Sequence, residues 1–151
     1  MQKTTEQENG VKKILVINGH GGNLRPLLEV ALRAREELGI IVAIYQWWTA
    51  LRNELLDMFE EQELGHAGAA ETSLIAYLKP DNVKLDQAVD KTPRNPLGGI
   101  PVYAFTYTHE VTSSGVYGKS STADSSKGSR IFEAAVNQLV RIVETLKKLN
   151  V

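Results

Sequence analysis

The stretch Ile14-Leu15-Val16-Ile17-Asn18-Gly19-His20-Gly21-Gly22-Asn23 decides the fold, because it joins a short apolar run to a glycine-rich turn. The β-branched and leucine residues at 14–17 are typical of a strand buried on both faces of a parallel sheet. From Leu24 to Leu38, apolar residues recur at intervals of three, four and seven, which predicts an amphipathic helix. The apolar run 40–45 predicts a second buried strand, so residues 11–45 form a βαβ unit.

The predicted helix has recognisable ends. Asn23 stands where a capping side chain is favoured, and Pro26 falls in the first turn, where proline is tolerated. Gly39 follows the last apolar position and suits the left-handed residue that ends many helices.

The rest of the chain alternates between helical and loop patterns. Residues 49–63 are acidic with a narrow apolar stripe, which predicts a surface helix or lid. A third helix is expected over 68–78, ended by Pro80. Residues 92–101 are rich in proline and predict a loop, and 102–108 predict a strand. The final helix has one apolar face, made by Phe132, Ala135, Val136, Leu139, Ile142, Val143 and Leu146.

Composition indicates one soluble domain. The chain has 151 residues, 17 Lys and Arg against 18 Asp and Glu, and no Cys. The lack of Cys excludes disulfides and thiolate metal sites, and the balanced charge favours neither nucleic acid nor an anionic membrane. No apolar run approaches the roughly 20 residues that span a bilayer. We therefore expect a cytoplasmic protein with a disordered leader over residues 1–10 and a folded domain over 11–151.

His20 is the first candidate for chemistry. It lies at the carboxyl end of a buried strand, where open α/β sheets bind ligands, and the glycines around it allow close approach. A phosphate loop would also place glycines at such a turn, but neither phosphate-binding motif is present. The structural alternative is a turn in which the histidine only makes local hydrogen bonds.

A second candidate segment reads H-A-G-A-A-E-T-S over residues 66–73. His66 is suited to general acid or base catalysis, because imidazole titrates near neutral pH. Glu71 falls early in the helix that follows, where it is a metal ligand, a group that orients one, or a first-turn glutamate that stabilises the helix dipole.

Three further features are weaker. Trp47 and Trp48 end the second predicted strand, so their indoles are expected to point in opposite directions, with one facing the active edge. His109 ends the later predicted strand and is expected at the surface. The turn at residues 115–118 is either an ordinary glycine turn or one wall of a pocket.

Taken in order, the segment 14–23, the H-A-G-A-A-E-T-S segment and Gly115-Val116-Tyr117-Gly118 resemble the creatininase (creatinine amidohydrolase) family. The resemblance implies a three-layer α/β/α sandwich with a mostly parallel sheet. It also implies a metal-dependent amidohydrolase with a two-metal centre of Zn, Mn or Fe, assembled as an oligomer.

The resemblance assigns roles to individual residues. It implies that His20 and Glu71 are metal ligands and that His66 is the catalytic histidine. It places Gly21, Gly22, Asn23 and Trp48 at the substrate pocket.

The sequence departs from the family in two ways. Gly22 stands where creatininase proper has an acidic ligand, so the chain is closer to a G-H-G-G-N branch that includes formamide deformylases and peptide-processing members. Family members are also much longer, and their first half supplies a Glu-x-His pair and an Asp that this sequence lacks. The chain is therefore expected to be the C-terminal half of such an enzyme.

Three hypotheses follow. In the first, the chain is part of a metal-dependent amidohydrolase. This enzyme cleaves a small cyclic amide or formamide once a missing N-terminal half or a partner chain completes it. The second is a non-catalytic creatininase-like binding or assembly subunit. The third, a flavodoxin-like nucleotide-binding domain, should show a phosphate loop. Since residues 18–24 and 64–73 carry no Lys or Arg, a neutral substrate is expected rather than a polyanion.

Overall fold

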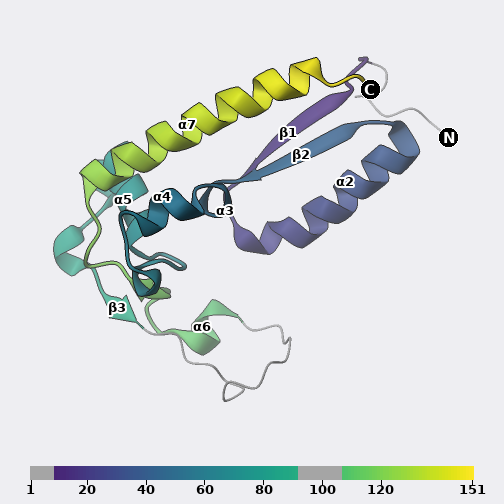
Figure 1. The fold of residues 1–151 in the computed structure, drawn as a ribbon. Coiled ribbons are helices and arrows are strands. Elements are labelled where there is room, and N and C mark those ends of the chain that lie inside the picture. Colours follow the sequence, from purple (N-terminus) through teal and green to yellow (C-terminus); the bar gives the residue numbers. More distant parts are fainter. Residues whose placement is uncertain (1–8, 92–106) are drawn as a thin grey trace. The chain divides into compact units, whose positions relative to one another are not determined.

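A computed structural model describes residues 9–91 and 107–151 (Figure 1). The strands are β1 (Lys13–Asn18), β2 (Ile41–Gln46), β3 (Asp90–Lys91) and β4 (Gly118–Lys119). The α-helices are α2 (Leu24–Leu38), α3 (Trp47–Ala50), α4 (Arg52–Leu56), α5 (Ala69–Leu78), α6 (Thr108–Val111) and α7 (Ser125–Lys148). Short 3₁₀ turns are η1 (Gly21–Asn23), η2 (Glu61–Glu63), η3 (Pro80–Asn82) and η4 (Leu85–Gln87). The predicted leader up to residue 8, the loop at 92–101 and the strand at 102–106 lie outside the described residues.

The chain divides into two compact units. The first contains residues 1–51 and 135–151, and the second contains residues 52–134. Helix α7 contributes to both, its first ten residues to the second unit and the remainder to the first.

The predicted βαβ unit is confirmed in the first unit. Strands β1 and β2 pair in parallel, in a register that runs from Lys13 opposite Ile41 to Asn18 opposite Gln46. Helix α2 connects them and ends at Gly39, which adopts a left-handed conformation with φ of 70°. The predicted end of the helix at Gly39 is confirmed. Glycine readily adopts the left-handed conformation that ends many helices.

The two strands lie between α2 and the C-terminal part of α7 (Figure 1). Side chains alternate between the faces of a strand, so Lys13 and Tyr45 share one face. On that face the Tyr45 hydroxyl donates to Gln138 Oε1 at 3.1 Å, and Lys13 Nζ donates to the Lys147 carbonyl at 3.2 Å. These bonds fasten residues 135–151 to the sheet, and the first unit has the α/β/α layering of the predicted fold class.

The prediction that both strands are buried on both faces is wrong in degree. Most of their residues are half-buried, and Ile17 is 63% exposed. In the described part of the chain β1 and β2 pair only with each other. Apolar runs such as theirs are typical of strands in wider parallel sheets that are covered on both faces.

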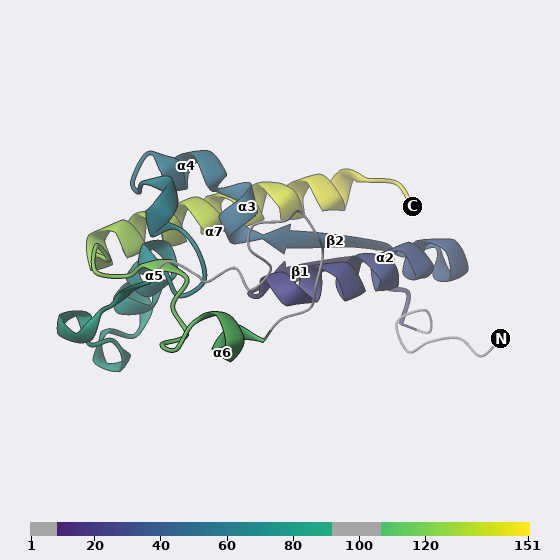
Figure 2. The same cartoon turned by 90° about the horizontal axis from the view of Figure 1, so that it is seen from below.

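In the second unit, α5 packs closely against the start of α7 (Figure 2). A Cβ atom at Gly128 would lie 2.0 Å from the Ser73 carbonyl oxygen, so only glycine allows this approach. The buried Ser73 hydroxyl accepts a hydrogen bond from the Asp124 N–H at 2.9 Å, and the Tyr77 and Phe132 rings lie 5.9 Å apart. The predicted helices over 68–78 and along the last apolar stripe are confirmed.

The acidic stretch over 49–63 is neither a continuous helix nor a surface lid. It forms α3, α4 and η2, and the apolar residues Leu51, Leu55 and Phe59 are buried. Its hydrophobic stripe is therefore part of the core. The described residues contain no helix that is long and apolar enough to cross a membrane.

Candidate functional site

The turn that carries His20 is organised by Asn18. This side chain is only 2% exposed, and its Nδ2 donates to the His20 carbonyl at 2.8 Å and to Gln46 Oε1 at 3.0 Å. Its Oδ1 accepts the His20 N–H at 3.2 Å and the Asn23 amide at 3.4 Å. The sequence analysis assigned no role to Asn18. A polar side chain directly after four apolar ones was the available signal, since buried amides must find partners.

The His20 imidazole lies over Gly22. A Cβ atom at Gly22 would be 2.8 Å from His20 Nε2, so a larger residue there would require the ring to shift. On the same turn, a Cβ at Gly21 would lie 3.8 Å from the indole of Trp48. The structure thus gathers His20, Gly21, Gly22 and Trp48 in the first unit.

Two sequence expectations near this turn are wrong. Asn23 lies within η1 with helical backbone angles (φ −78°, ψ −17°), whereas a capping residue is typically extended, and it makes no side-chain capping bond to α2. Its side-chain Nδ2 donates to Asn18 Oδ1 instead. Trp47 and Trp48 begin α3 and are both half-buried, so their rings meet edge to face with centroids 5.7 Å apart. Adjacent helical residues need not point to opposite sides as adjacent strand residues do.

The turn that carries His66 is held by backbone hydrogen bonds. The His66 carbonyl accepts the Tyr117 N–H at 2.7 Å. The next N–H, that of Ala67, donates to Glu71 Oε2 at 2.5 Å. Ala67 has φ of 52°, a left-handed conformation that costs an alanine about 1–2 kcal/mol. The surrounding bonds therefore hold Ala67, the residue after His66, in a conformation that the isolated chain would avoid.

Glycines allow the backbone segments around His66 to approach closely. A Cβ at Gly65 would lie 2.1 Å from the Tyr117 carbonyl oxygen, and one at Gly118 would lie 2.7 Å from the Leu64 carbonyl oxygen. Both glycines also have positive φ. The segments 62–66 and 117–119 therefore lie against each other.

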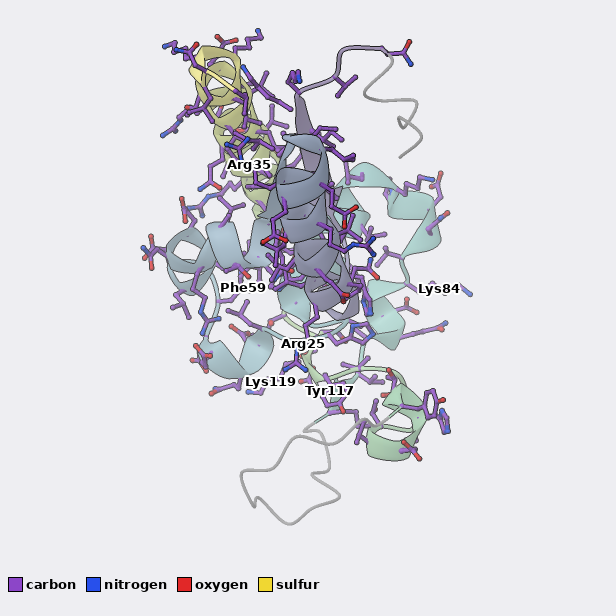
Figure 3. The ribbon with its side chains drawn as sticks, turned by 90° about the vertical axis from the view of Figure 1, so that its right-hand side faces the viewer. Arg25, Arg35, Phe59, Lys84, Tyr117 and Lys119 are labelled. Atoms are coloured by element: carbon purple, nitrogen blue, oxygen red, sulfur yellow. The ribbon has the colours of Figure 1, made fainter. Side chains whose placement is uncertain are left out.

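These segments form an open pocket of about 540 Å³ that includes His66. Its lining residues are Gln62, Leu64, Gly65, His66, Asp90, Lys91, Tyr117, Gly118 and Lys119. The interpretation of residues 115–118 as a pocket wall is confirmed for Tyr117 and Gly118. The side chains of Tyr117 and Lys119, two of the lining residues, can be seen in Figure 3.

The charge at this pocket differs from the sequence expectation. Residues 64–73 carry no cation, but β3 and β4 bring Lys91 and Lys119 to the pocket together with Asp90. Hydrogen bonds from the Ser121 backbone and hydroxyl lower the pKa of Asp90, so its carboxylate is ionised at neutral pH. The pocket therefore has charged groups of both signs at its rim.

Glu63 is a residue that sequence reasoning missed. It is only 9% exposed, and its carboxylate accepts the Glu60 N–H at 2.7 Å. Its pKa is lowered, first by the Thr122 hydroxyl, then by the Glu60 N–H, with Lys127 and Lys119 adding favourable charge. An acidic residue within an acidic stretch looks solvent-exposed in the sequence, so only the fold shows that it is buried.

Glu63 predicts acid sensitivity of the second unit. A carboxyl whose pKa is lowered by folding stabilises the fold above its unfolded pKa of about 4.3, and this stability is lost as the pH falls through the folded value. We expect Glu63→Gln to lower the free energy of unfolding by about 1–2 kcal/mol at pH 7 and to reduce its pH dependence below about pH 5. Urea titrations at several pH values measure both effects.

The control for this prediction is Glu61→Gln. Glu61 is exposed and pairs with Arg52 at the surface, so its loss should cost less than about 1 kcal/mol. Equal acid sensitivity in Glu63→Gln and in the unmodified chain would contradict the assignment.

His109 does not end a strand. It lies in α6, where its exposed ring stacks on Tyr107 with centroids 5.5 Å apart. The surface location is confirmed, and it makes His109 a useful control for the other two histidines.

The two predicted metal ligands belong to different units. His20 lies in the first unit, and Glu71 lies in the second, where its Oε2 accepts the Ala67 N–H. No group of three or more His, Cys, Asp or Glu suited to a metal ion occurs within 9–91 and 107–151. Imidazole and carboxylate are suitable donors for Zn²⁺ or Mn²⁺, but a protein site needs at least three of them.

The family model for Creatininase, described as creatinine amidohydrolase, matches residues 5–143. The chain belongs to the creatininase family. It is 30% identical over 142 residues to creatinine amidohydrolase of Pseudomonas putida, covering 85% of this chain and 53% of that protein. It is 29% identical over 133 residues to the mycofactocin precursor peptide peptidase of Mycolicibacterium smegmatis, covering 83% of this chain and 46% of that protein. The chain spans about half the length of these two relatives.

Solved creatininase structures confirm the α/β fold class. A creatinine amidohydrolase (creatininase) structure matches 96% of this chain and 60% of its own, with a TM-score of 0.73 and 26% identity. A manganese creatininase matches 93% and 59%, with a TM-score of 0.69 and 27% identity. A Zn-Zn form of a creatininase variant matches the same shares, with a TM-score of 0.68 and 26% identity. These three structures have the creatininase fold, and this chain matches about three fifths of each.

Proposed function

We propose that this chain supplies the catalytic histidine of a metal-dependent amidohydrolase, and that it is active when a missing N-terminal half or a partner chain completes the site. The substrate is a small cyclic amide or formamide, and the bond hydrolysed is C–N. The observation that carries the proposal is the His66 turn, whose 66–67 peptide group is hydrogen-bonded through both its N–H and its carbonyl, and which places His66 among the residues that line the pocket.

The role proposed for His66 is proton transfer to the departing nitrogen. An amine is a poor leaving group, so amide hydrolysis needs a general acid at that atom. His66 is exposed and lines the pocket, where it can reach a bound amide. His20 would contribute an imidazole ligand to a two-metal centre whose other ligands come from the completing half.

The need for completion is supported by three observations. The described residues lack a three-donor cluster, Ile17 of the two paired strands is 63% exposed, and the chain covers 46% and 53% of two relatives. The cytoplasmic location and the oligomeric assembly expected from the sequence stay predictions.

The test is reconstitution. The chain is mixed or co-expressed with a polypeptide that carries the Glu-x-His pair and the following Asp, and cyclic amides, formamides and short peptides are supplied with Zn²⁺ or Mn²⁺. We expect hydrolysis that rises with pH through a pKa near neutrality and stops with chelator. The chain alone should hydrolyse none of them.

A non-catalytic binding or assembly subunit is the second candidate, favoured by the missing three-donor group in the described part of the chain. The same experiment separates the two functions. Stable association with the completing half without amide cleavage supports the subunit, whereas cleavage of a phosphate ester without amide cleavage contradicts both.

A further inference from the structure

The peptide group between His66 and Ala67 is held from both sides. Its N–H donates to Glu71 Oε2 at 2.5 Å, and its carbonyl accepts the Tyr117 N–H at 2.7 Å. A peptide group is planar, so fixing its donor and its acceptor fixes its orientation. This peptide is attached directly to the His66 Cα, and its orientation constrains the direction of the His66 side chain.

The conformation of Ala67 needs such support. With φ of 52° it lies in the left-handed region, which alanine adopts rarely because its Cβ crowds the backbone. Its carbonyl also accepts the Thr72 hydroxyl at 3.3 Å. Glu71 and Thr72 are neighbours in the first turns of α5, and together they bind both polar backbone groups of this strained residue.

We propose that Glu71 is a positioning residue for His66. Its carboxylate holds the 66–67 peptide group and the left-handed Ala67, and it thereby directs the imidazole at the pocket. The inference rests on the proposed function in one respect, because it takes His66 as the group that transfers the proton. It differs from the role as a metal ligand that the family resemblance implies for Glu71.

Glutamine separates the two roles. Glu71→Gln keeps a side-chain oxygen of the same reach, which still accepts the Ala67 N–H, but it removes the negative charge that a metal ligand supplies. Glu71→Ala removes both properties. A positioning residue is therefore largely replaced by glutamine, whereas a metal ligand is not.

The first measurement uses this chain alone and needs no activity. Amide hydrogen exchange of Ala67, followed by NMR, reports the bond to Glu71. We expect exchange within about threefold of the unmodified chain in Glu71→Gln and at least about tenfold faster in Glu71→Ala, since a bond to a charged acceptor is lost. The Ala76 amide, further along α5, should be unchanged and shows that the helix is intact.

The second measurement uses the reconstituted enzyme. We expect Glu71→Ala to lower kcat by about 10- to 100-fold with KM and metal content nearly unchanged, and Glu71→Gln to lower it less than about fivefold. Adding Ala67→Gly to Glu71→Ala should recover part of the loss, because glycine adopts the left-handed conformation without help. A residue that acts only as a metal ligand predicts no such recovery.

Two outcomes would overturn the inference. One is unchanged Ala67 exchange in Glu71→Ala. The other is equal loss of bound metal in Glu71→Gln and Glu71→Ala, which would make Glu71 a ligand. If the exchange results hold but no variant cleaves an amide, the proposed function fails while the role of Glu71 in holding the His66 turn stands.

Discussion

Gly128→Ala should prevent the second unit from folding stably. The new Cβ would lie 2.0 Å from the Ser73 carbonyl oxygen and 2.9 Å from the Tyr77 Cβ, distances that require α5 and the start of α7 to separate. Backbone atoms cannot move aside as a flexible side chain can. We expect a loss of at least about 3 kcal/mol, measured by urea unfolding, or failure to obtain soluble protein.

Steric overlap and helix propensity predict opposite changes in the free energy of unfolding of Gly128→Ala. In an exposed helix, alanine is favoured over glycine by about 1 kcal/mol, so helix propensity alone predicts stabilisation. Asn137→Ala, at an exposed position of the same helix, should change stability by less than about 1 kcal/mol. A Gly128→Ala variant as stable as the unmodified chain would show that the two helices do not pack through this glycine.

His66→Ala should abolish turnover of the reconstituted enzyme, with kcat lowered by about 10²- to 10⁴-fold. The reason is its place on the pocket wall, where a proton donor can meet the leaving nitrogen. Metal content, measured after reconstitution, should be retained. His20→Ala should instead lose the metal, because the role proposed for that imidazole is a ligand.

His109→Ala is the matched control, since it removes an exposed imidazole from α6 and should change neither turnover nor metal content. Equal metal loss in His66→Ala and His20→Ala would show that both histidines are ligands and that the proposed division of roles is wrong.

Sequence periodicity was sufficient to predict the βαβ unit and the long helices. The spacing of apolar residues indicates which face of a helix or strand is buried, independently of the element that packs against it. Periodicity could not predict that Ile17 stays exposed, because its burial depends on neighbouring strands rather than on its own segment. The sequence analysis also placed Trp47 and Trp48 at the end of the second strand, whereas in the structure they are the first residues of α3.

The sequence predicted the two histidines of the candidate site from their residue type, but it did not predict the hydrogen bonds that hold the two turns. His20 and His66 were found because imidazoles beside glycines are conspicuous. Asn18, Glu63 and the bond from Ala67 to Glu71 were not found, since each depends on a backbone group brought near by the fold. Nothing in the sequence indicates the left-handed conformation of Ala67, because alanine rarely adopts positive φ.

The first unit draws on residues 1–51 and 135–151, and this arrangement sets an order of events during synthesis. The ribosome makes β1, α2 and β2 early, but Gln138 and Lys147, which bind Tyr45 and Lys13, emerge only after the whole second unit. Residues 52–134 are contiguous and form their own contacts first, since domains fold as units while the chain grows. During that interval the face of β1 and β2 that carries Lys13 and Tyr45 lacks these two bonds, so we expect the first unit to be completed only after residues 135–151 are translated.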